Sequence, residues 1–540
     1  MSERDTTAPP SALAPLKGPV FRMLWTAWLA ANVTMWMNEV TAAWLMTSLT
    51  DSIMMVALVG AASTLPVFVL GLPSGALADI VDRRKYFAFT QLYVAAIALL
   101  LAALVLADRL TAPLLLVLTV ANGIGMAMRW PVFAAIVPEV VSRAELPAAL
   151  ALNGIAMNMS RVIGPVVAGA LIAYAGSEYV FVINALLALF AFVLIIRWKR
   201  EQEPSVLPGE RFFGAMRVGL QHVVQSPRMR KVLFRIFLFF LQSTSLTALL
   251  PLIARDIHGG GPVSFTVLLA AMGGGAIVAA LNLQRLRRRI DRDGFVRWGT
   301  CIHAIAAVVA VLSPWFPLAV AAMAIAGMAW IATANSLTVA AQLALPNWVR
   351  ARGMSIYQMA LMGGGAAGAV LWGQVASQTT LVFAICAAAV FGPLVLLFTH
   401  RISVSGGLDE DFTPAKVKSS AEPPAVGIRP EAGPVMVTVE YIIDPAQADG
   451  FDAVMQETRR ARLRQGALSW GLFRDAAQPG RYIEYFLDEN WIEHQRRLER
   501  FTAADVGLRE RRQTFHIGDD PPRVHRYVAQ AGRARARDKR

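Results

Sequence analysis

Charged residues and cysteine are both scarce in this chain of 540 residues. Asp, Glu, Lys and Arg make up 16% of it, against about 25% in an ordinary soluble domain. Because 56% of the residues are hydrophobic, the chain has too little polar surface to enclose them in water, which argues against a disordered or purely soluble protein. The two cysteines, Cys301 and Cys386, lie in separate apolar stretches, so neither a disulfide framework nor a zinc site is expected.

Motifs that define several other protein classes are also missing. The chain has no glycine-rich phosphate loop, which disfavours ATP-driven transport and leaves an ion gradient or the substrate's own gradient as the energy source. The histidines are scattered, with no pair at helical spacing, so no metal site, cofactor or catalytic site is expected. The net charge of +14 lacks the interleaved aromatic pattern that would indicate a nucleic-acid partner.

Long apolar runs are what the chain has in abundance. A run of about 20 residues can cross a hydrocarbon layer of about 30 Å as a helix. Such runs are predicted at residues 20–46, 53–77, 84–107, 110–137, 146–174, 178–197, 231–255, 263–284, 295–313, 316–345, 353–376 and 380–399. The expected fold is therefore an all-α membrane protein with twelve transmembrane helices.

The composition divides the chain into seven segments. A polar stretch separates the apolar runs into two groups of six, which echo each other weakly at an offset of about 200 residues, as expected of a duplicated transporter. The segments are a leader (1–19), a first half (20–197), a central loop (198–230), a second half (231–400), a linker (401–433), a soluble domain (434–529) and a basic tail (530–540).

The distribution of Lys and Arg predicts the orientation in the membrane. Basic residues gather at 83–85, 197–231 and 285–297, whereas the alternate loops hold only Arg109 and Arg255. Cytoplasmic loops carry the excess of Lys and Arg in membrane proteins. We therefore expect a multi-pass inner-membrane protein with both termini in the cytoplasm. The leader has no signal-peptide core, and the basic tail could bind anionic membrane lipid.

The soluble domain has the pattern of a small α+β fold. Residues 435–443 alternate like a strand, 467–475 and 481–488 read as a hairpin, and 524–529 as a last strand. Helical sequence fills the intervening stretches. The order strand, helix, strand, strand, helix, helix, strand predicts a ferredoxin-like domain.

The loop between the second and third runs reads GALADIVDRRK over residues 75–85. Gly75 permits close helix approach, and Asp79 can pair with a basic group at the cytoplasmic face and so latch one state of the protein. The block, with Arg83 and Arg84, resembles the loop signature of the major facilitator superfamily. Ile80 and Asp82 depart from the usual Arg and Gly.

The fifth run carries a bend motif, Gly164, Pro165 and Gly169. Glycine thins a membrane helix and proline removes a backbone donor. The motif resembles the signature of drug and metabolite antiporters. The stretches TLPVFVLGLPSGALADIVDRRK, IVPEVVSRAELPAALALNG and RARGMSIYQMALMGGGAAGAVLWG resemble the enterobactin-exporter-like, or transmembrane secretion effector, branch. That resemblance implies export coupled to a proton gradient.

Charges within the apolar runs are expensive and indicate a cavity or a partner. Glu39, in the first run, is interpreted either as the carrier of the coupling proton or as a structural partner of Arg161 or Arg129. Arg129 and Arg235 are interpreted as interfacial charges. The further residues expected to line the proton or substrate site are Asn32, Asn38, Asn158, Gln242, Asn335 and Gln358.

The soluble domain is similar to the ferredoxin-like dimeric barrels of antibiotic-biosynthesis monooxygenases, which implies dimerisation through it. Glu493 and His494 would be the acid–base pair of such an enzyme, but neighbours in a helix point to different faces. The favoured function is a secondary exporter of a small amphipathic molecule (siderophore, drug or metabolite) by alternating access, not an enzyme. The alternatives are a membrane-tethered enzyme and a sensor with the soluble domain as its active or output module.

Overall fold

The computed structural model describes residues 13–142, 145–198, 212–257, 259–286, 290–346, 348–400, 402–404, 411–413, 415 and 427–530. The chain folds into two compact units. The first comprises residues 1–207, 233–340 and 355–405, and contains the long helices. The second comprises 208–232, 341–354 and 406–540, and contains the sheet.

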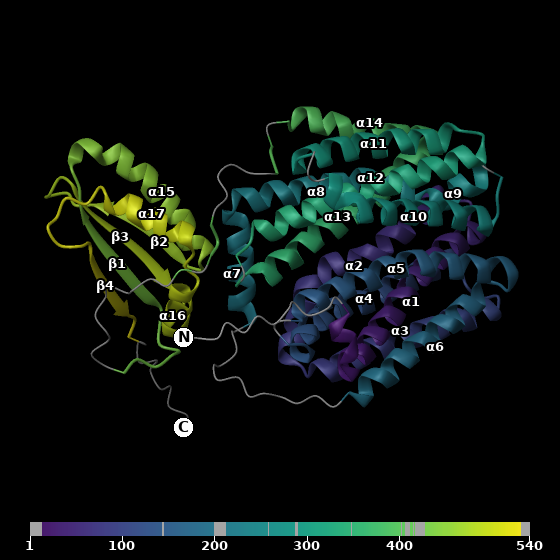
Figure 1. Ribbon diagram of the computed structural model, residues 1–540, viewed down its shortest axis with the longest axis horizontal. Helices are drawn as coiled ribbons and strands as arrows, with labels where there is room; N and C mark the ends of the chain where they lie inside the picture. The colour runs from purple at the N-terminus through teal and green to yellow at the C-terminus, as the bar shows by residue number, and fades with distance from the viewer. Residues whose placement is uncertain are drawn as a thin grey trace, which may run out of the picture. The chain divides into compact units, whose positions relative to one another are not determined.

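The first unit is built from two sets of long helices (Figure 1). The first half holds α1 (Pro19–Leu49), α2 (Ile53–Ile80), α3 (Arg83–Leu106), α4 (Ala112–Val140), α5 (Leu146–Tyr174) and α6 (Ser177–Arg197). The second half holds α8 (Pro227–Ala248), the short α9 (Leu250–Leu252), α10 (Pro262–Leu286), α11 (Arg292–Leu312), α12 (Phe316–Leu343), α13 (Arg350–Gln378) and α14 (Leu381–Phe398).

The first helix is more polar than the sequence analysis expected of a spanning helix. Eleven described helices are long and apolar enough to cross a membrane, and α1 is not among them. Its 31 residues are ample in length, but Asn32, Asn38 and Glu39 lower its hydropathy. Since α1 packs closely on α5 and α6 and buries half of its residues, the first half surrounds these polar groups with protein.

Small polar residues fix where several helices begin. Ser52, Asp82, Asp291 and Thr380 each accept a hydrogen bond from a backbone N–H in the first turn of the helix that follows. Such caps satisfy donors that have no partner within the helix. They therefore define the residue at which each of these helices begins.

The two halves pack together at the membrane face opposite the start of α1, here called the far face. The large apolar core there draws on both halves, for example Met46 and Leu115 from the first and Leu249 and Leu268 from the second. Figure 1 shows α2 and α5 facing α13 and α10 along the seam. A Cβ on Gly169 of α5 would overlap the side chain of Thr266 on α10, so the helices are in direct contact.

A second apolar core lies at the near face, where α1 begins. It includes Phe21 at the start of α1, Tyr86 near the start of α3, Val137 near the end of α4 and Trp198 after α6. All of its buried members belong to the first half. The large core joins the halves at the far face, so the first unit is closed on that side.

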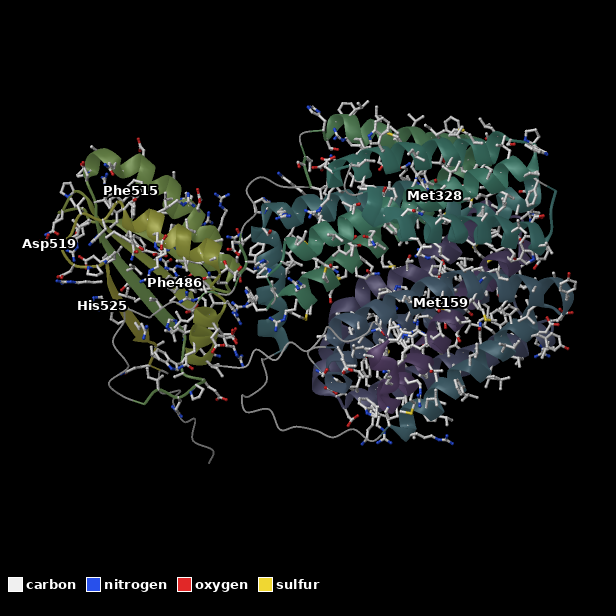
Figure 2. The ribbon with its side chains drawn as sticks, in the orientation of Figure 1. Met159, Met328, Phe486, Phe515, Asp519 and His525 are labelled. Carbon is white, nitrogen blue, oxygen red and sulfur yellow. The ribbon has the colours of Figure 1, made fainter. Side chains whose placement is uncertain are left out.

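The second unit contains a four-stranded antiparallel sheet in the order β2-β3-β1-β4. Its elements are β1 (Val435–Ile442), α15 (Ala448–Arg464), β2 (Ser469–Arg474), β3 (Arg481–Asp488), α16 (Trp491–Glu499), α17 (Ala503–Gln513) and β4 (Arg523–Val528). The ferredoxin-like order predicted from the sequence is confirmed. Phe486 and Phe515, labelled in Figure 2, belong to the core of this domain.

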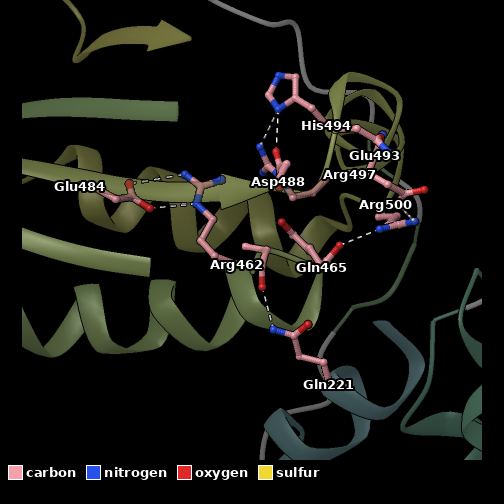
Figure 3. Close-up of polar contacts among 11 residues, drawn as sticks. Gln221, Arg462, Gln465, Glu484, Asp488, Glu493, His494, Arg497 and Arg500 are labelled. Atoms are coloured by element: carbon pink, nitrogen blue, oxygen red, sulfur yellow. Dashed lines mark hydrogen bonds and ion pairs between the residues drawn. The ribbon is translucent and has the colours of Figure 1, made fainter. Parts of the chain in front are cut away.

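The second unit also includes a helix that sequence analysis assigned to the polar central loop, α7 (Phe212–Gln225). Arg217 of α7 forms an ion pair of 2.8 Å with Glu489, and Gln221 donates a hydrogen bond of 2.7 Å to the Ala467 carbonyl. Figure 3 shows the Gln221 contact. The ring of His222 packs edge-on against Trp348, with 5.4 Å between ring centroids.

Candidate functional site

Arg161 of α5 lies between two indole rings. Its guanidinium carbon is 4.9 Å from the ring centroid of Trp36 on α1 and 4.4 Å from that of Trp330 on α12. Trp36 belongs to the first half and Trp330 to the second, so this cation touches both halves. A desolvated cation–π contact contributes about 2 kcal/mol, which compensates part of the cost of burying the charge.

Glu39 of α1 lies close enough to Arg161 for the two charges to interact, and both residues are half-buried. The two residues that sequence analysis joined as proton carrier and partner are thus neighbours in the structure. Opposite charges compensate each other's desolvation inside a membrane protein. A carboxylate, a guanidinium and two indoles together can bind an amphipathic molecule that carries an ionisable group.

Other polar residues of α1 face the protein interior. Asn32 is fully buried and its Nδ2 donates a hydrogen bond of 2.7 Å to the Trp28 carbonyl, while its Oδ1 has no partner among the described residues. Asn38 is also buried. The close packing of α1 on α5 has a simple cause, because a Cβ on Gly164 would overlap Trp36.

Arg129 of α4 is a buried charge that sequence analysis wrongly interpreted as interfacial. It is 2% exposed, and its Nη1 donates a hydrogen bond of 2.7 Å to the Ala31 carbonyl. Its guanidinium also lies over the ring of Trp28, 5.5 Å from the centroid. The error arose because Arg129 precedes Trp130, a pair typical of a membrane interface, whereas α4 continues to Val140. Arg235, given the same interpretation, is buried as well.

The remaining expected site residues are spread over the helices of both halves. Asn335 of α12 and Gln358 of α13 are half-buried. Gln242 of α8 is buried against Gly392 of α14, within the second half. Asn158 lies on α5, but its side chain is outside the described part of the structure.

The loop motif is only partly described. Gly75 and Asp79 lie at the end of α2, and their side chains are outside the described part of the structure. Arg83 forms an ion pair with Glu139 at the end of α4, and Arg84 donates to the Ile196 carbonyl at the end of α6. The motif therefore ties together three helix ends of the first half. Sequence analysis missed Glu139, although an acidic residue four positions before the basic loop residue Arg143 could have indicated it.

The bend motif lies where α5 meets both its neighbours. Gly164 contacts α1 and Gly169 contacts α10, while Pro165 stands inside the helix between them. Each glycine lets another helix approach to a distance that a side chain would prevent. This explains why the motif needs small residues on two sides of one helix.

His494 of the sheet domain pairs with Asp488 and not with Glu493. Its Nδ1 is 2.7 Å from Asp488 Oδ2, and Asp488 also accepts 3.0 Å hydrogen bonds from Arg497 (Figure 3). Glu493 instead binds Arg496 and Arg500. Burial lowers the pKa of His494, so the ring is neutral near pH 7. The Glu493–His494 acid–base pair that an enzyme would need is therefore not formed.

A second buried acid, Glu484, anchors the helices to the sheet. It accepts hydrogen bonds from Arg462 Nε at 2.9 Å, from Trp470 Nε1 at 3.1 Å and from the Tyr441 hydroxyl at 3.1 Å. Burial alone would raise the pKa of Glu484, but Arg462 and Arg512 outweigh it and lower the pKa to about 2. The carboxylate is fully satisfied and works as a structural ion, not as an acid.

Several relatives of known name resemble this chain. Macrolide efflux protein A of Streptococcus pyogenes is 23% identical over 265 residues, which are 49% of this chain and 65% of the relative. The staphyloferrin A transporter of Staphylococcus aureus is 20% identical over 256 residues, 47% of this chain and 64% of the relative. The chain thus spans slightly less than two thirds of the length of either relative.

Solved transporters share the fold of the first unit. A bacterial homologue of the human lysosomal transporter Spinster, in an inward-facing and occupied conformation, matches with a TM-score of 0.59 at 15% identity. The match covers 73% of this chain and 98% of that one. An autoinhibited peptide transporter of the POT family matches with a TM-score of 0.59 at 13% identity, over 73% of this chain and 99% of that one.

The pattern that defines the transmembrane secretion effectors covers almost the whole chain. It matches residues 10–535, including both sets of long helices and the sheet domain. The two packed halves, the charge buried at their seam and the efflux and siderophore relatives agree with that match. The chain belongs to the transmembrane secretion effector family and is a multi-pass membrane protein with the fold of the major facilitator transporters.

Proposed function

We propose that the protein is a proton-coupled exporter of small amphipathic molecules. It lies in the inner membrane with both termini in the cytoplasm. The observation that carries the proposal is the contact of Arg161 with indoles of both halves, beside Glu39. A binding site at the seam of two six-helix halves can face either side of the membrane in turn. Membership of the family and the efflux relatives support export over uptake.

The site favours a substrate with an apolar body and an ionisable group. Trp36 and Trp330 offer flat apolar surfaces, and the Arg161–Glu39 pair can exchange its internal contact for a contact with an anionic or cationic group. Macrolides and staphyloferrin A, the molecules named for two relatives, are therefore the first compounds to test.

Glu39 is the proposed carrier of the coupling proton. As a carboxylate, Glu39 would attract a cationic group of the substrate; protonation would remove that attraction and release the substrate, and loss of the proton would restore the binding state. Coupling of this kind needs no cofactor, because the proton and the substrate compete for one carboxylate. The proton gradient then drives the exchange.

Transport into everted vesicles tests the proposal. A radiolabelled macrolide and staphyloferrin A are the probes, with an imposed proton gradient as the energy source. Glu39→Gln is expected to abolish gradient-driven transport and to retain downhill exchange, since glutamine has the shape and neutrality of the protonated carboxyl. Glu178→Gln, at the start of α6, is the matched control and is expected to transport normally. Full gradient-driven transport by Glu39→Gln would refute the coupling role.

A structural role of the Glu39–Arg161 pair makes a different prediction. Breaking the pair would leave an uncompensated buried cation and lower the amount of folded protein, and Arg161→Met added to Glu39→Gln would restore it. Detergent-extracted protein is therefore measured beside transport for the single and double variants. Normal abundance of Glu39→Gln with lost coupling supports the proton carrier.

We further propose that the sheet domain joins two copies of the chain. One face of the sheet is covered by helices, while the other exposes apolar side chains such as Ile442, Phe473 and Tyr527. His525, labelled in Figure 2, lies on β4 in the same face. Two such faces packed together would bury these side chains. Phe473→Asp is expected to leave the protein monomeric in detergent by light scattering, whereas Arg474→Asp, on the same strand, is the control.

A further inference from the structure

The second half has an irregular helix end at the far face. Helix α8 ends at Ala248, the single turn α9 follows with Pro251 inside it, and residues Ile253–Ile257 then form a π turn (Figure 1). Proline has no backbone N–H to donate, so the regular hydrogen bonding of α8 does not continue through this segment. Single π turns are rare and are frequent at functional sites. This helix end is therefore a candidate for a role in transport.

The irregular segment packs against the first half. Its apolar residues Leu250, Leu252 and Ile253 are buried in the large core that both halves share, and α9 packs on α1 and α2. The middle residue of the π turn is Arg255, whose side chain is 31% exposed. This cation therefore lies at the rim of the seam, where water reaches it and where the first half is within its reach.

Arg255 contacts the first half through its Nη1 nitrogen. This nitrogen donates a hydrogen bond of 2.9 Å to the Thr47 carbonyl, near the end of α1, and lies 3.9 Å from Asp51 Oδ1 in the loop that joins α1 to α2. The loop is short and held at both ends, because the Thr50 N–H closes the last turn of α1 and Ser52 caps α2. One guanidinium group of the second half thus bridges the seam to a fixed corner of the first.

The π turn also gives Arg255 a partner in its own half. Its Nε donates a hydrogen bond of 2.6 Å to Asp256 Oδ1, and its Nη2 lies 3.5 Å from Asp256 Oδ2. Consecutive side chains of a regular α-helix do not face each other, so the irregular backbone makes this pair possible. The guanidinium therefore keeps a carboxylate partner when its contacts with the first half are broken.

The other basic residue of the far-face loops has no such position. Arg109, which the sequence analysis paired with Arg255 as an exception to the basic loops, is exposed in the loop between α3 and α4. Its side chain forms no ion pair or hydrogen bond within the described part of the chain. Two arginines therefore share the far face, and the one in the π turn joins the halves.

The contacts of Arg255 are of a kind that can break in every cycle. A hydrogen bond from a charged donor to a carbonyl is stronger than one between neutral groups. The contact with Asp51 is exposed, so it is weak and is screened by salt. Because the guanidinium is partly exposed, water can replace the Thr47 carbonyl when the halves separate. These contacts bias the equilibrium toward the closed far face without fixing it there.

We propose that Arg255 is a latch between the two halves, which favours the state closed at the far face. When that face opens, the guanidinium leaves Thr47 and Asp51 and stays with Asp256. The inference rests on the proposed export only for the direction in which the substrate passes the latch, since opening and closing can be observed without substrate or a proton gradient.

Double electron–electron resonance of the full-length protein in lipid nanodiscs tests the proposal. With both native cysteines replaced by alanine, spin labels are attached to Tyr174→Cys and Trp315→Cys, two exposed far-face positions in the first and second half. Arg255→Gln is expected to raise the ratio of far-open to far-closed molecules about tenfold, which corresponds to about 1.4 kcal/mol. Arg109→Gln, the same change at the other far-face arginine, is expected to leave the ratio unchanged.

Asp256→Asn separates a latch from a general loosening of the helix end. It is expected to lower the far-open ratio, because Arg255 then has its partners in the first half and loses the one that it keeps on opening. A rise of the ratio in Asp256→Asn, an unchanged ratio in Arg255→Gln, or an equal rise in Arg109→Gln would overturn the inference.

Transport distinguishes the latch from the proposed function. If the distances change as expected but macrolide and staphyloferrin A transport in vesicles ignores the proton gradient, the proposed function fails and the latch stands. If transport follows the gradient while Arg255→Gln leaves the distances unchanged, the latch fails and the proposed function stands.

Discussion

Replacing the buried carboxylate Glu484 by glutamine is the sharpest test of how the sheet domain is held together. The carboxylate is fully buried and faces Arg462, Trp470 and Tyr441, with Arg512 close enough to interact. Glutamine keeps the shape but removes the negative charge, and so leaves two buried guanidinium groups without their counter-ion. Breaking a buried ion pair in this way costs about 3–5 kcal/mol.

The pKa of Glu484 gives an independent value for the free energy by which the carboxylate stabilises the folded domain. Folding lowers the pKa from its ordinary value of 4.5 to about 2. At about 1.4 kcal/mol for each pH unit, the charged form stabilises the folded domain by about 3 kcal/mol. Because the folded pKa is the lower one, this stabilisation is present above about pH 4.5 and is lost as the pH falls toward 2.

Hydrogen exchange of the full-length protein in detergent measures the effect. In Glu484→Gln the amides of β1 and β3 are expected to exchange about a hundredfold faster at pH 7, which corresponds to about 3 kcal/mol. Glu440→Gln is the matched control, because Glu440 lies on β1 in the opposite face and forms a half-exposed pair of 2.8 Å with Arg481. Such an exposed pair contributes less than about 1 kcal/mol. Equal protection in the two variants would refute the structural role of the buried network.

Three further predictions concern other parts of the chain. Burial, together with the charge of Arg464, lowers the pKa of His222 from 6.5 to about 4, so the attachment of α7 is expected to weaken as the pH falls through this window. At pH 5 the free energy that attaches α7 is expected to fall by about 2 kcal/mol. Amide exchange in α7, corrected for intrinsic rates, should then be about thirtyfold faster, and His222→Gln should abolish this pH dependence. Gly169→Val should hinder closure at the far face by collision with Thr266 and slow transport about tenfold or more. Gly274→Val is the control, because a Cβ there meets nothing within 4 Å, and it should not slow transport. Asp79→Asn is expected to slow transport per molecule at unchanged membrane abundance, and equal activity would remove its role as a latch.

The order of elements could be predicted from the sequence because each element carries a strong local signal. Apolar runs between basic loops located the long helices, and alternation between turn residues located the four strands. The helix α7 was missed because it lies in a polar segment and has a narrow apolar face. Val218 on its apolar side is buried, and this burial depends on the folded sheet domain of the same unit.

The buried charges show where sequence reasoning stops. Charge within an apolar run correctly singled out Glu39 and Arg161, since such residues need a partner in any fold. The choice of partner was beyond the sequence, because Trp36 is 125 residues and Trp330 is 169 residues away from Arg161 along the chain. Arg129 was assigned to the membrane interface because its local sequence resembles one, and only the packing of α1 on α4 makes it a buried donor.

Histidine 303 marks a different limit of sequence reasoning. A lone histidine in an apolar helix is ordinarily a satisfied core residue, and sequence analysis grouped His303 with the scattered histidines. Whether a polar side chain is satisfied depends on the atoms around it, which a sequence does not contain. The structure shows that both ring nitrogens of His303, and Oε1 of Gln242, have no hydrogen-bond partner among the described residues.

The contact of Arg161 with Trp330 is strong enough to hold the two halves in one arrangement and weak enough to be broken during a conformational change. A cation–π contact of about 2 kcal/mol holds the two halves in one arrangement but can be exchanged for a contact with substrate. A direct ion pair across the seam, desolvated and hydrogen-bonded, would cost about 3–5 kcal/mol to break and would oppose each cycle. The charge that balances Arg161 instead comes from Glu39 in the same half, so these two interacting charges can move together while the indole contact is made and lost. Trp330→Leu should therefore change the balance between the two states without disturbing the folding of the first half.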